Sequence, residues 1–272
     1  MYAVILAGGS GTRLRPLRGT EEPVAFQALP DGRTLLQHTC ARLARLVDPM
    51  DVVVVANRRH GQLVRDQLPD ARIVTQPMNR GTATALALAI VSVERAADET
   101  MVVLTADHEV EREDILKEAI AAADGQIVGG ALGIERPLVA FAVRPTKADR
   151  ELTYIQPSFD GGQRIAGQRV YRVNAVEPKP DTNRTRQLYE SGTTYWASGI
   201  YLWQRAAIAD AVQRYTPLFP LVGPAYRSEL ALRAAYDRLQ PVSIEEGVLA
   251  GAARDGVVLT VPLEVGWSER GA

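Results

Sequence analysis

The sequence predicts an α/β fold, with a mixed, mostly parallel sheet, helices on both of its faces and a small antiparallel insertion. The first half of the chain alternates short β-branched runs with longer segments in which apolar residues recur every three or four positions. Its strands are apolar throughout, as expected when helices cover both sides of a sheet. After about Val139 the segments become extended, polar and rich in Pro and Gly, which indicates antiparallel structure.

The elements are expected in the following order. Five strands come first, with the sequences YAVILAG, DVVVVAN, ARIVTQ, TMVVLTAD and QIVGGAL. The helices between them are expected at about Thr34–Val47, Arg58–Leu68, Gly81–Ala97 and Glu113–Ala123. The segments FAVRPT, LTYIQPSF, QRVYRVNAVEPKP and YWASGIYLW then form an antiparallel region inserted at about 139–204. Two more helices, at Arg205–Tyr215 and Ser228–Leu239, and a last strand, VVLTVPL, complete one domain over 1–272.

Composition narrows the class of protein. The 31 basic and 32 acidic residues nearly cancel, so we expect neither a nucleic acid nor a membrane surface as a partner. No stretch reaches the roughly 20 apolar residues that cross a bilayer, and the chain begins directly with a strand instead of a signal sequence. The single cysteine, Cys40, excludes an internal disulfide, and we expect a reducing, cytoplasmic location.

A glycine-rich loop follows the first strand. In LAGGSGTRL, three glycines within four positions let the backbone turn tightly and point successive N–H groups at an anion. Arg13 adds a fixed positive charge with forked donors, which suits a phosphate. The loop matches neither G-x-G-x-x-G nor the P-loop, and the glycines alone also fit an ordinary strand-to-helix turn. Together the loop and Arg13 favour a phosphate site.

Leu6–Leu14, with Pro16 and Leu17, resembles the signature L-A-G-G-x-G-T-R-L-x-P-L of the sugar-1-phosphate nucleotidyltransferases, especially the mannose-1-phosphate guanylyltransferases. Segments similar to other motifs of that family follow in the family's order: QPMNRGTATA, LTADHEV, FAVRPT, YWASGIYLW, SIEEGVL and VPLEVGWSERG. The resemblance covers nearly the whole chain and implies a Rossmann-like nucleotide-diphospho-sugar transferase fold. It also implies a reaction in which GTP and mannose 1-phosphate give GDP-mannose and pyrophosphate. Since the last motif lies at the end of the sequence, we expect no C-terminal β-helix or cupin domain.

The resemblance assigns roles to residues at matching positions. Those expected to bind the nucleotide are Leu6, Ala7, Gly8, Gly9, Gly11, Thr12, Arg13, Gln76, Arg80, Thr82 and Ala83. Those expected to bind the sugar phosphate are Asp107, Glu177, Lys179, Ser198 and Gly199. Asp107 and Glu269 would hold Mg²⁺ or Mn²⁺, and the catalytic residues would be Arg13, Asp107 and Lys179. The partners would be GTP and a sugar 1-phosphate, or a nucleotide sugar, and the sequence leaves a homodimer open.

Several of these positions have a plainer interpretation from the residues alone. An Asp at a strand end, such as Asp107, more often caps a helix, and Gly81–Thr84 reads as an ordinary helix start. His108 receives no chemical role. The aromatic residues of YWASGIYLW alternate as in a half-buried strand and are expected in the core, with Ser198 and Gly199 facing the ligand.

The sequence departs from the family pattern where the family carries its chemistry. Glu22 replaces the lysine that precedes proline, Glu269 replaces an aspartate, Ala197 replaces an asparagine, and Gly81 replaces the asparagine of R-N-T-A. Two further differences are Val24 in place of a basic residue and Leu152-Thr153-Tyr154 in place of G-Y-G.

Reversing one charge beside a phosphate matters, because two unit charges about 4 Å apart interact by about 4 kcal/mol at an effective dielectric constant near 20. Arg15 and Arg18 lie in the same loop and are candidates to replace the missing cation in part. Two alternatives therefore remain: a catalytically weak homologue that binds a nucleotide sugar in a regulatory role, or a nucleotidyltransferase for another sugar or base.

Overall fold

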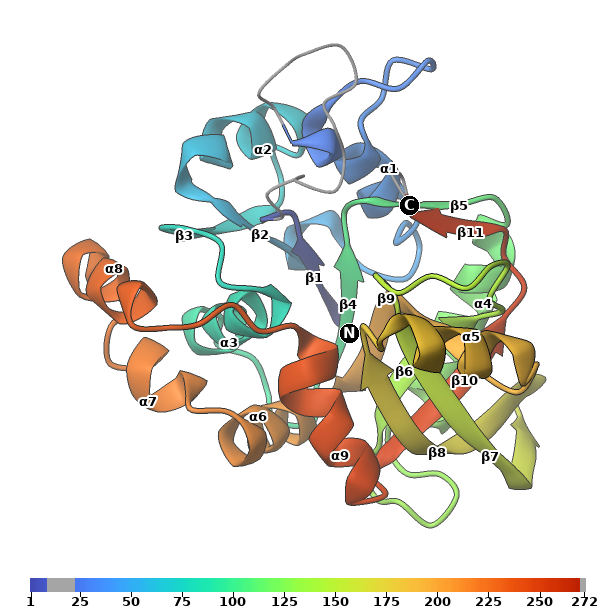
Figure 1. Cartoon of the computed structure of the whole chain (residues 1–272). Helices are drawn as coiled ribbons and strands as arrows, with labels where there is room; N and C mark the ends of the chain where they lie inside the picture. Colours follow the sequence, from blue (N-terminus) through green and yellow to red (C-terminus); the bar gives the residue numbers. More distant parts are fainter. Residues whose placement is uncertain (9–22, 270–272) are drawn as a thin grey trace.

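The computed structural model describes residues 1–8 and 23–269. Within them, one nine-stranded sheet has the order β3-β2-β1-β4-β9-β6-β10-β8-β7 (Figure 1). Its strands are β1 (Tyr2–Leu6), β2 (Val52–Asn57), β3 (Arg72–Gln76), β4 (Thr100–Thr105), β6 (Leu138–Val143), β7 (Thr153–Ile165), β8 (Gln168–Pro178), β9 (Tyr195–Gln204) and β10 (Val258–Leu263). A second, two-stranded sheet pairs β5 (His108–Val110) with β11 (Trp267–Glu269).

The helices lie around the main sheet (Figure 1). They are α1 (Leu35–Ala41), α2 (Gly61–Gln67), α3 (Thr82–Ser92), α4 (Glu113–Gln126), α5 (Thr182–Glu190), α6 (Arg205–Tyr215), α7 (Leu218–Val222), α8 (Glu229–Asp237) and α9 (Ala250–Arg254). Helix α3 packs against β1, β2 and β3, and α4 packs against β9 and β10. No helix among the described residues is long and apolar enough to span a membrane.

The half of the sheet that contains β3, β2, β1 and β4 is parallel. Strand β1 is apolar along its whole length, YAVIL, and all five of its residues are buried, which is the pattern expected of a central parallel strand. Residues Leu6 and Thr105 are partners at the carboxyl ends of β1 and β4. Open α/β sheets place their ligands at these ends, so a site is expected at this edge of the sheet.

The other half of the sheet closes on itself. Strand β9 runs antiparallel to both β4 and β6, and β10 runs parallel to β6 and antiparallel to β8. Strand β7 pairs with β8 and also with β9, through Tyr154↔Trp196 and Ile155↔Tyr195. Strands β9, β6, β10, β8 and β7 therefore form a closed ring. This arrangement confirms the predicted mixed sheet with antiparallel strands in the second half of the chain.

Two predictions about the strands were wrong. QIVGGAL is not a strand, because α4 continues to Gln126 and the glycine-rich segment then turns, with positive φ at Gly130 and Gly133; the strand begins only at Leu138. The residues of β9 from Tyr195 to Trp203 are all buried and do not alternate. Strand β9 is paired with β4 and β6 along its two edges, and its uniform burial shows that both of its faces are covered as well.

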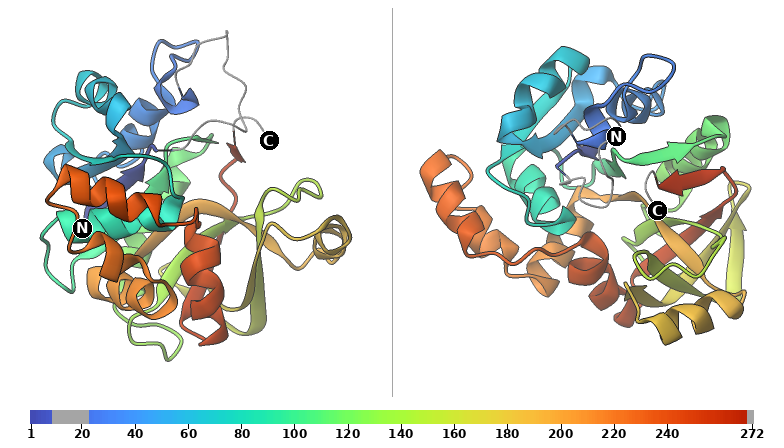
Figure 2. Two further views of the ribbon diagram at one scale, coloured as in Figure 1. Left: turned by 60° about the vertical axis from the view of Figure 1, so that its left-hand side comes forward. Right: turned by 45° about the horizontal axis from the view of Figure 1, so that its top comes forward.

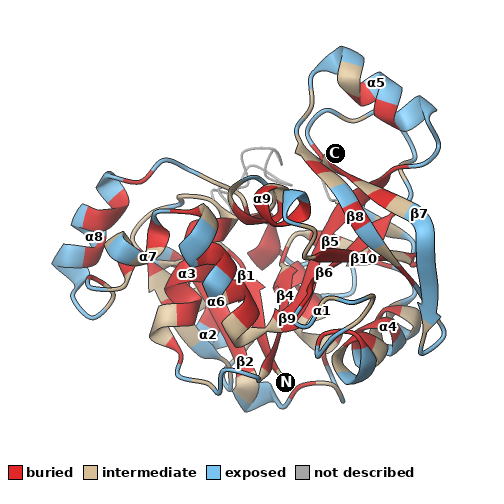
Figure 3. Cartoon of the chain, turned by 90° about the horizontal axis from the view of Figure 1, so that it is seen from below, coloured by how far each residue is buried: buried red, intermediate tan, exposed pale blue. Residues whose placement is uncertain are grey.

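Many of the buried residues lie along the strands of the main sheet, and exposed residues lie on the outer elements. Figure 3 shows buried residues along the strands of the sheet, whereas exposed residues mark the outer turns of α5 and α8 and much of β7. In Figure 2, α7 and α8 lie at the outside of the molecule, and β11 lies next to β5. The large aromatic side chains of Phe141, Tyr201 and Trp203 are almost completely buried, so the core extends across the join between the two halves of the sheet.

Two phenylalanines test this placement of the core. Phe141 in β6 is fully buried, whereas Phe159 in the β7–β8 hairpin is 46% exposed. Phe141→Ala is expected to lower the free energy of unfolding by about 3–5 kcal/mol, because it removes a buried ring and leaves a cavity. Phe159→Ala is the matched control and should lower it by less than about 1 kcal/mol. Urea denaturation measures both, and equal losses would contradict this core.

Candidate functional site

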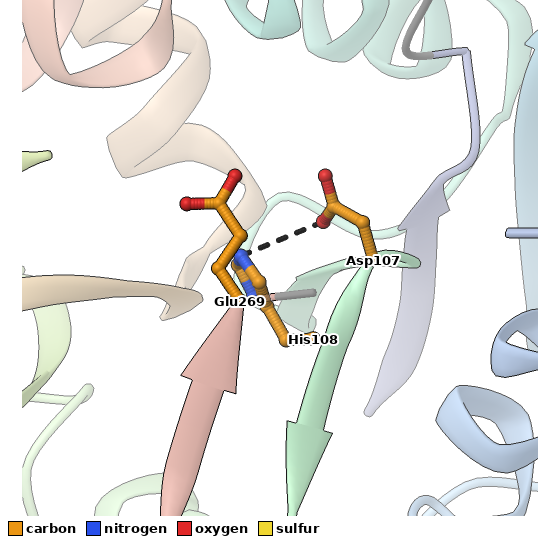
Figure 4. Close-up of side chains that lie close together, drawn as sticks. All are labelled: Asp107, His108 and Glu269. Carbon is orange, nitrogen blue, oxygen red and sulfur yellow. Dashed lines mark ion pairs between the residues drawn. The ribbon is translucent and has the colours of Figure 1, made fainter. Parts of the chain in front are cut away.

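The candidate site lies at the small sheet that joins β5 to β11. Strand β4 ends at Thr105, a turn at Ala106 and Asp107 follows, and β5 begins at His108. Strand β11, near the other end of the chain, pairs antiparallel with β5, so that Glu269 faces His108 in the ladder. This pairing brings the predicted metal ligands Asp107 and Glu269 together (Figure 4).

Three potential metal ligands converge at this point. One ligand atom each from Asp107, His108 and Glu269 lie within 4.8 Å of one another. Oδ1 of Asp107 is buried, forms no hydrogen bond with the part of the chain that the structure describes, and lies 3.5 Å from Nε2 of His108. A buried acceptor without a hydrogen bond costs about 1–3 kcal/mol, and a cation would remove that cost. Two carboxylates also suit Mg²⁺ or Mn²⁺, so the residues present fit a divalent cation.

His108 is held in a fixed orientation. Its Nδ1 lies 2.8 Å from Oγ1 of Thr105, and its ring packs edge-on against Trp267, with 4.9 Å between the ring centroids. Nε1 of Trp267 donates to the carbonyl oxygen of Ser198 at 3.0 Å. These contacts leave Nε2 of His108 directed toward Asp107 (Figure 4). The sequence alone indicates no role for His108, because a histidine after Asp107 fits equally well as a hydrogen-bonding neighbour or as a partly buried residue.

Gly199 and Ser198 serve the structure of this site. Gly199 has φ +73°, and a Cβ atom there would overlap the His108 ring and lie 2.7 Å from Oγ1 of Thr105. The side chain of Ser198 is fully buried, and its Oγ donates to the carbonyl oxygen of Phe141 at 2.7 Å. Any contact of Ser198 with a sugar would therefore involve its backbone, and the sugar-binding role of both residues stays a prediction.

The described start of the glycine-rich loop lies beside this cluster. The carbonyl oxygen of Leu6 accepts from N of Ala106, and N of Ala7 donates to the carbonyl oxygen of Val55. A Cβ atom at Gly8 would overlap the side chain of Gln76, which is 1% exposed. Its Oε1 is buried and has no hydrogen-bond partner among the described residues. The predicted residues Gly9, Gly11, Thr12 and Arg13 lie outside the described residues, as do Arg15, Arg18 and Glu22.

The remaining predicted nucleotide contacts have partners within the protein. Nε of Arg80 donates to the carbonyl oxygen of Tyr236 at 2.7 Å. Oγ1 of Thr82 accepts from N of Ile244 at 2.9 Å, and N of Ala83 donates to the carbonyl oxygen of Val242 at 3.2 Å. These bonds hold the start of α3 against the segment that follows α8. The contacts of these three residues with a nucleotide remain predictions.

The predicted sugar residues Glu177 and Lys179 lie at the end of β8. Oε2 of Glu177 accepts from Nε of Arg184 at 2.8 Å, and this hydrogen bond raises the pKa of Arg184. Nζ of Lys179 lies 3.6 Å from Oε2 of Glu151. Lys179 also has φ +43°, an unusual conformation for a residue with a side chain.

A row of rings connects this end of β8 with Asp107, His108 and Glu269, which together form the metal-ligand cluster. Tyr154 is the ladder partner of Glu177 and packs edge-on against Trp196, with 6.4 Å between the ring centroids. Trp196 in turn lies 6.3 Å from Trp267, which contacts His108. A row of mostly buried rings therefore connects the two groups of predicted site residues.

Comparison with known proteins identifies the family. Residues 2–219 match the family model described as nucleotidyl transferase. The chain belongs to the nucleotidyl transferase family. This membership confirms the resemblance found in the sequence motifs.

Relatives of this nucleotidyl transferase carry more specific names. The alginate biosynthesis protein AlgA of Pseudomonas putida is 31% identical over 290 residues, which span 100% of this chain and 56% of AlgA. The mannose-1-phosphate guanylyltransferase of Escherichia coli is 28% identical over 293 residues, 100% of this chain and 58% of that protein. The nucleotidyl transferase chain thus spans little more than half the length of these curated relatives.

Solved structures agree with the fold. The structure described as mannose-1-phosphate geranyltransferase from Thermus thermophilus has a TM-score of 0.80 and 30% identity, over 99% of this chain and 76% of that one. The inositol-1-phosphate CTP transferase from T. maritima, at 17% identity and a TM-score of 0.63, shows the shared fold alone.

Gly81 offers a test at a position where the chain departs from the family pattern. Its φ of +85° and ψ of 168° lie in a region that is essentially restricted to glycine, and a Cβ atom would lie 2.6 Å from the backbone N and C of Val242. Gly81→Asn, which introduces the family residue, is therefore expected to lower the free energy of unfolding by about 2 kcal/mol or more.

Gly192→Asn is the matched control, because Gly192 also has positive φ, +64°, but a Cβ atom there meets nothing within 4 Å. It should cost no more than about 1 kcal/mol in urea denaturation. An unchanged stability of Gly81→Asn would show that the segment around Val242 does not pack as described.

Proposed function

We propose that this nucleotidyl transferase forms a GDP-sugar and pyrophosphate from GTP and a sugar 1-phosphate, with mannose 1-phosphate as the sugar substrate. The observation that carries the proposal is the convergence of Asp107 and Glu269 beside the start of the glycine-rich loop. The identity of about 30% with proteins named for mannose-1-phosphate guanylyltransferase activity supports the choice of sugar and base.

In the proposed reaction a phosphate oxygen of the sugar 1-phosphate attacks the α-phosphorus of GTP. The new P–O bond forms in line with the breaking bond between the α-phosphorus and the oxygen that bridges to the β-phosphate, and pyrophosphate leaves. Such a transfer needs no covalent intermediate on the protein, and its rate depends on positioning and on stabilisation of charge. The chain's task is therefore to hold two phosphorylated substrates in line.

Asp107 and Glu269 are the proposed ligands of Mg²⁺ or Mn²⁺, with Nε2 of His108 directed at the same point. The cation would neutralise phosphate charge during the transfer. The contacts with Thr105 and Trp267 keep the imidazole of His108 beside the carboxylates before substrate arrives. Compared with an aspartate, the longer side chain of Glu269 places its carboxylate one methylene further from its backbone.

Other residues would recognise the organic parts of the substrates. The buried Oε1 of Gln76 has no partner within residues 1–8 and 23–269, and it is an acceptor that N–H groups on the edge of a guanine base would satisfy. Lys179, whose side chain is 56% exposed, would contact the sugar phosphate, and Glu177 would accept from sugar hydroxyl groups. The rings of Tyr154 and Trp196 lie between these residues and the metal ligands. A cytoplasmic location is part of this proposal.

A second candidate function is binding of a nucleotide sugar with little turnover. Position 197, an asparagine in the family pattern, is an alanine buried to 7% exposure in β9, so it offers no side-chain donor or acceptor to a sugar. The presence of Glu22 at the position of the family lysine supports the same candidate function. Pyrophosphate release from GTP and mannose 1-phosphate separates the two, because the binding protein would hold GDP-mannose without releasing pyrophosphate.

The proposed metal ligands can be tested without an activity assay. Asp107→Asn and Glu269→Gln should each weaken Mn²⁺ binding by about tenfold or more, because each removes a negatively charged ligand. Electron paramagnetic resonance titration of free Mn²⁺ measures this directly. Glu264→Gln is the matched control, since Glu264 is exposed and lies outside the cluster. Equal Mn²⁺ affinity in all four proteins would refute the assignment.

Glu22→Lys tests whether the altered charge limits catalysis. It would place a cation next to the phosphates, where the resemblance puts one. The rate of pyrophosphate release should rise by about tenfold or more if the missing positive charge is what limits the rate. GDP-mannose binding serves as the control for an intact sugar site. No rise would indicate that Ala197 and the missing glycines already disable the sugar site, and high activity in the unaltered protein would refute the low-turnover candidate.

A further inference from the structure

A second concentration of charge lies away from the metal-ligand cluster. At one end of the ring of strands is a cavity of about 490 Å³, lined where β6, β10 and the β7–β8 hairpin meet the start of α4. Four arginines line it: Arg112, Arg144, Arg164 and Arg169. Glu264 is the single acidic residue among the described residues of its lining. In a chain whose basic and acidic residues nearly cancel, this local excess of positive charge is unusual.

The arginines in this cavity have few partners within the protein. Arg144 lies over the ring of Tyr195, 5.5 Å from its centroid, and Arg164 donates to the carbonyl oxygen of Gly167 at 3.1 Å. Among the described residues, no carboxylate forms an ion pair with any of the four. Each guanidinium carries five N–H donors, so most of these donors face solvent or the cavity. Four like charges around one cavity repel one another unless an anion lies between them.

A second cavity provides the contrast within the same molecule. It has a volume of about 560 Å³ and is lined by Arg136, Arg172 and Arg214 together with Glu135, Asp210 and Asp255. There Arg214 pairs with Asp255 at 2.8 Å, Arg136 lies 3.4 Å from Asp210, and Arg172 donates to the carbonyl oxygen of Leu132. Its arginines are matched by acceptors, whereas those of the first cavity are not.

The arginine-lined cavity is distinct from the candidate active site. Tyr195 and Trp196 are neighbours in β9, so their side chains point to opposite faces of that strand. Trp196 lies on the side of Trp267 and Tyr154, whereas Tyr195 lies on the side of Arg144 and the cavity. Strand β9 therefore separates the two.

The two places are nevertheless connected through the backbone. N of Arg112 donates to the carbonyl oxygen of Val265 at 3.0 Å, and N of Glu111 donates to the same oxygen. Val265 directly follows Glu264 and leads into β11, which carries Glu269. The backbone of Arg112 therefore links an occupant held by its side chain to the segment that leads into β11.

We propose that this cavity is a second anion site, which binds a small molecule carrying a di- or triphosphate group. Phosphate is the anion that several converging guanidinium groups bind well, because their forked donors match its oxygens. The volume lies in the range of small-molecule sites, so both inorganic pyrophosphate and a nucleotide fit. Tyr195 is only 7% exposed and already covered by Arg144, so recognition rests on the phosphates and not on stacking of a base.

The test is isothermal titration calorimetry of inorganic pyrophosphate into the full chain, at low salt and with EDTA to remove divalent cations. The double variant Arg144→Gln/Arg169→Gln should lose this binding by about a hundredfold, about tenfold for each charge-assisted contact removed. The matched control, Arg136→Gln/Arg214→Gln, removes two arginines from the charge-balanced cavity and should bind as the unaltered protein does. Arg144→Lys/Arg169→Lys should retain part of the affinity, since it keeps the charge and loses the forked geometry.

GDP is the second probe and distinguishes the source of the phosphates. Equal affinity of GDP and pyrophosphate, both lost in Arg144→Gln/Arg169→Gln, supports recognition of the diphosphate alone, and tighter arginine-dependent binding of GDP supports a nucleotide as the occupant. Melting temperatures check folding, which the exchange of exposed arginines should leave unchanged. The proposal is overturned if pyrophosphate does not bind, or if it binds equally to the unaltered protein and to Arg144→Gln/Arg169→Gln. Asp107→Asn removes a proposed metal ligand but should leave pyrophosphate binding at the arginine-lined cavity intact. The result of this test therefore does not depend on whether the proposed function is correct.

Discussion

The structure depends on the placement of β9 between β4 and β6. This strand is antiparallel to both neighbours and buried on both faces, and it joins the parallel half of the sheet to the ring formed with β10, β8 and β7. It also sets the shape of the candidate site. Gly199 leaves room for the His108 ring, and the carbonyl oxygen of Ser198 holds the indole of Trp267. A side chain at position 199 would therefore disturb both the sheet and the proposed metal ligands.

The site shows how a fold can bring together residues that are distant in the sequence. Asp107 comes from the turn after β4, and Glu269 comes from a short strand near the other end of the chain. The β5–β11 ladder is only three residue pairs long, and side-chain contacts between Trp267, His108 and Trp196 reinforce it. The aromatic residues near the site thus have a structural role, whichever substrate the site accepts.

Much of the fold could be predicted because its patterns are local. The β-branched runs gave β1, β2, β3 and β4, and the order of the motifs gave the family. The prediction of a strand at QIVGGAL was wrong because Ile127 and Val128 are buried apolar residues in the turn that follows α4. A short apolar run does not distinguish a strand from such a turn. The uniform burial of β9 could not be predicted either, since it depends on neighbours that are far away in the sequence.

The site was predictable only in part, for a physical reason. The motifs predicted that Asp107 and Glu269 belong to one site, and the structure brings the two carboxylates together. The motif LTADHEV includes His108 without indicating a role for it, since the direction of its ring depends on Thr105 and on the space left by Gly199. The motifs also gave no indication of the arginine-lined cavity, because Arg112 precedes α4, Arg144 follows β6 and Arg169 lies in β8, and only the fold brings them together.

The β5–β11 ladder also has a consequence for the order of events during synthesis of the chain. The parallel half of the sheet can begin to fold while the ribosome is still translating the second half, since domains tend to fold from the N-terminus as the chain emerges. The carboxylate of Glu269 cannot reach Asp107 until β11 has left the ribosomal exit tunnel and paired with β5. A nascent chain would therefore pass through a stage in which most of its core is assembled but Asp107 still lacks Glu269 beside it. The proposed binding of a divalent cation would begin only after β11 has joined the structure.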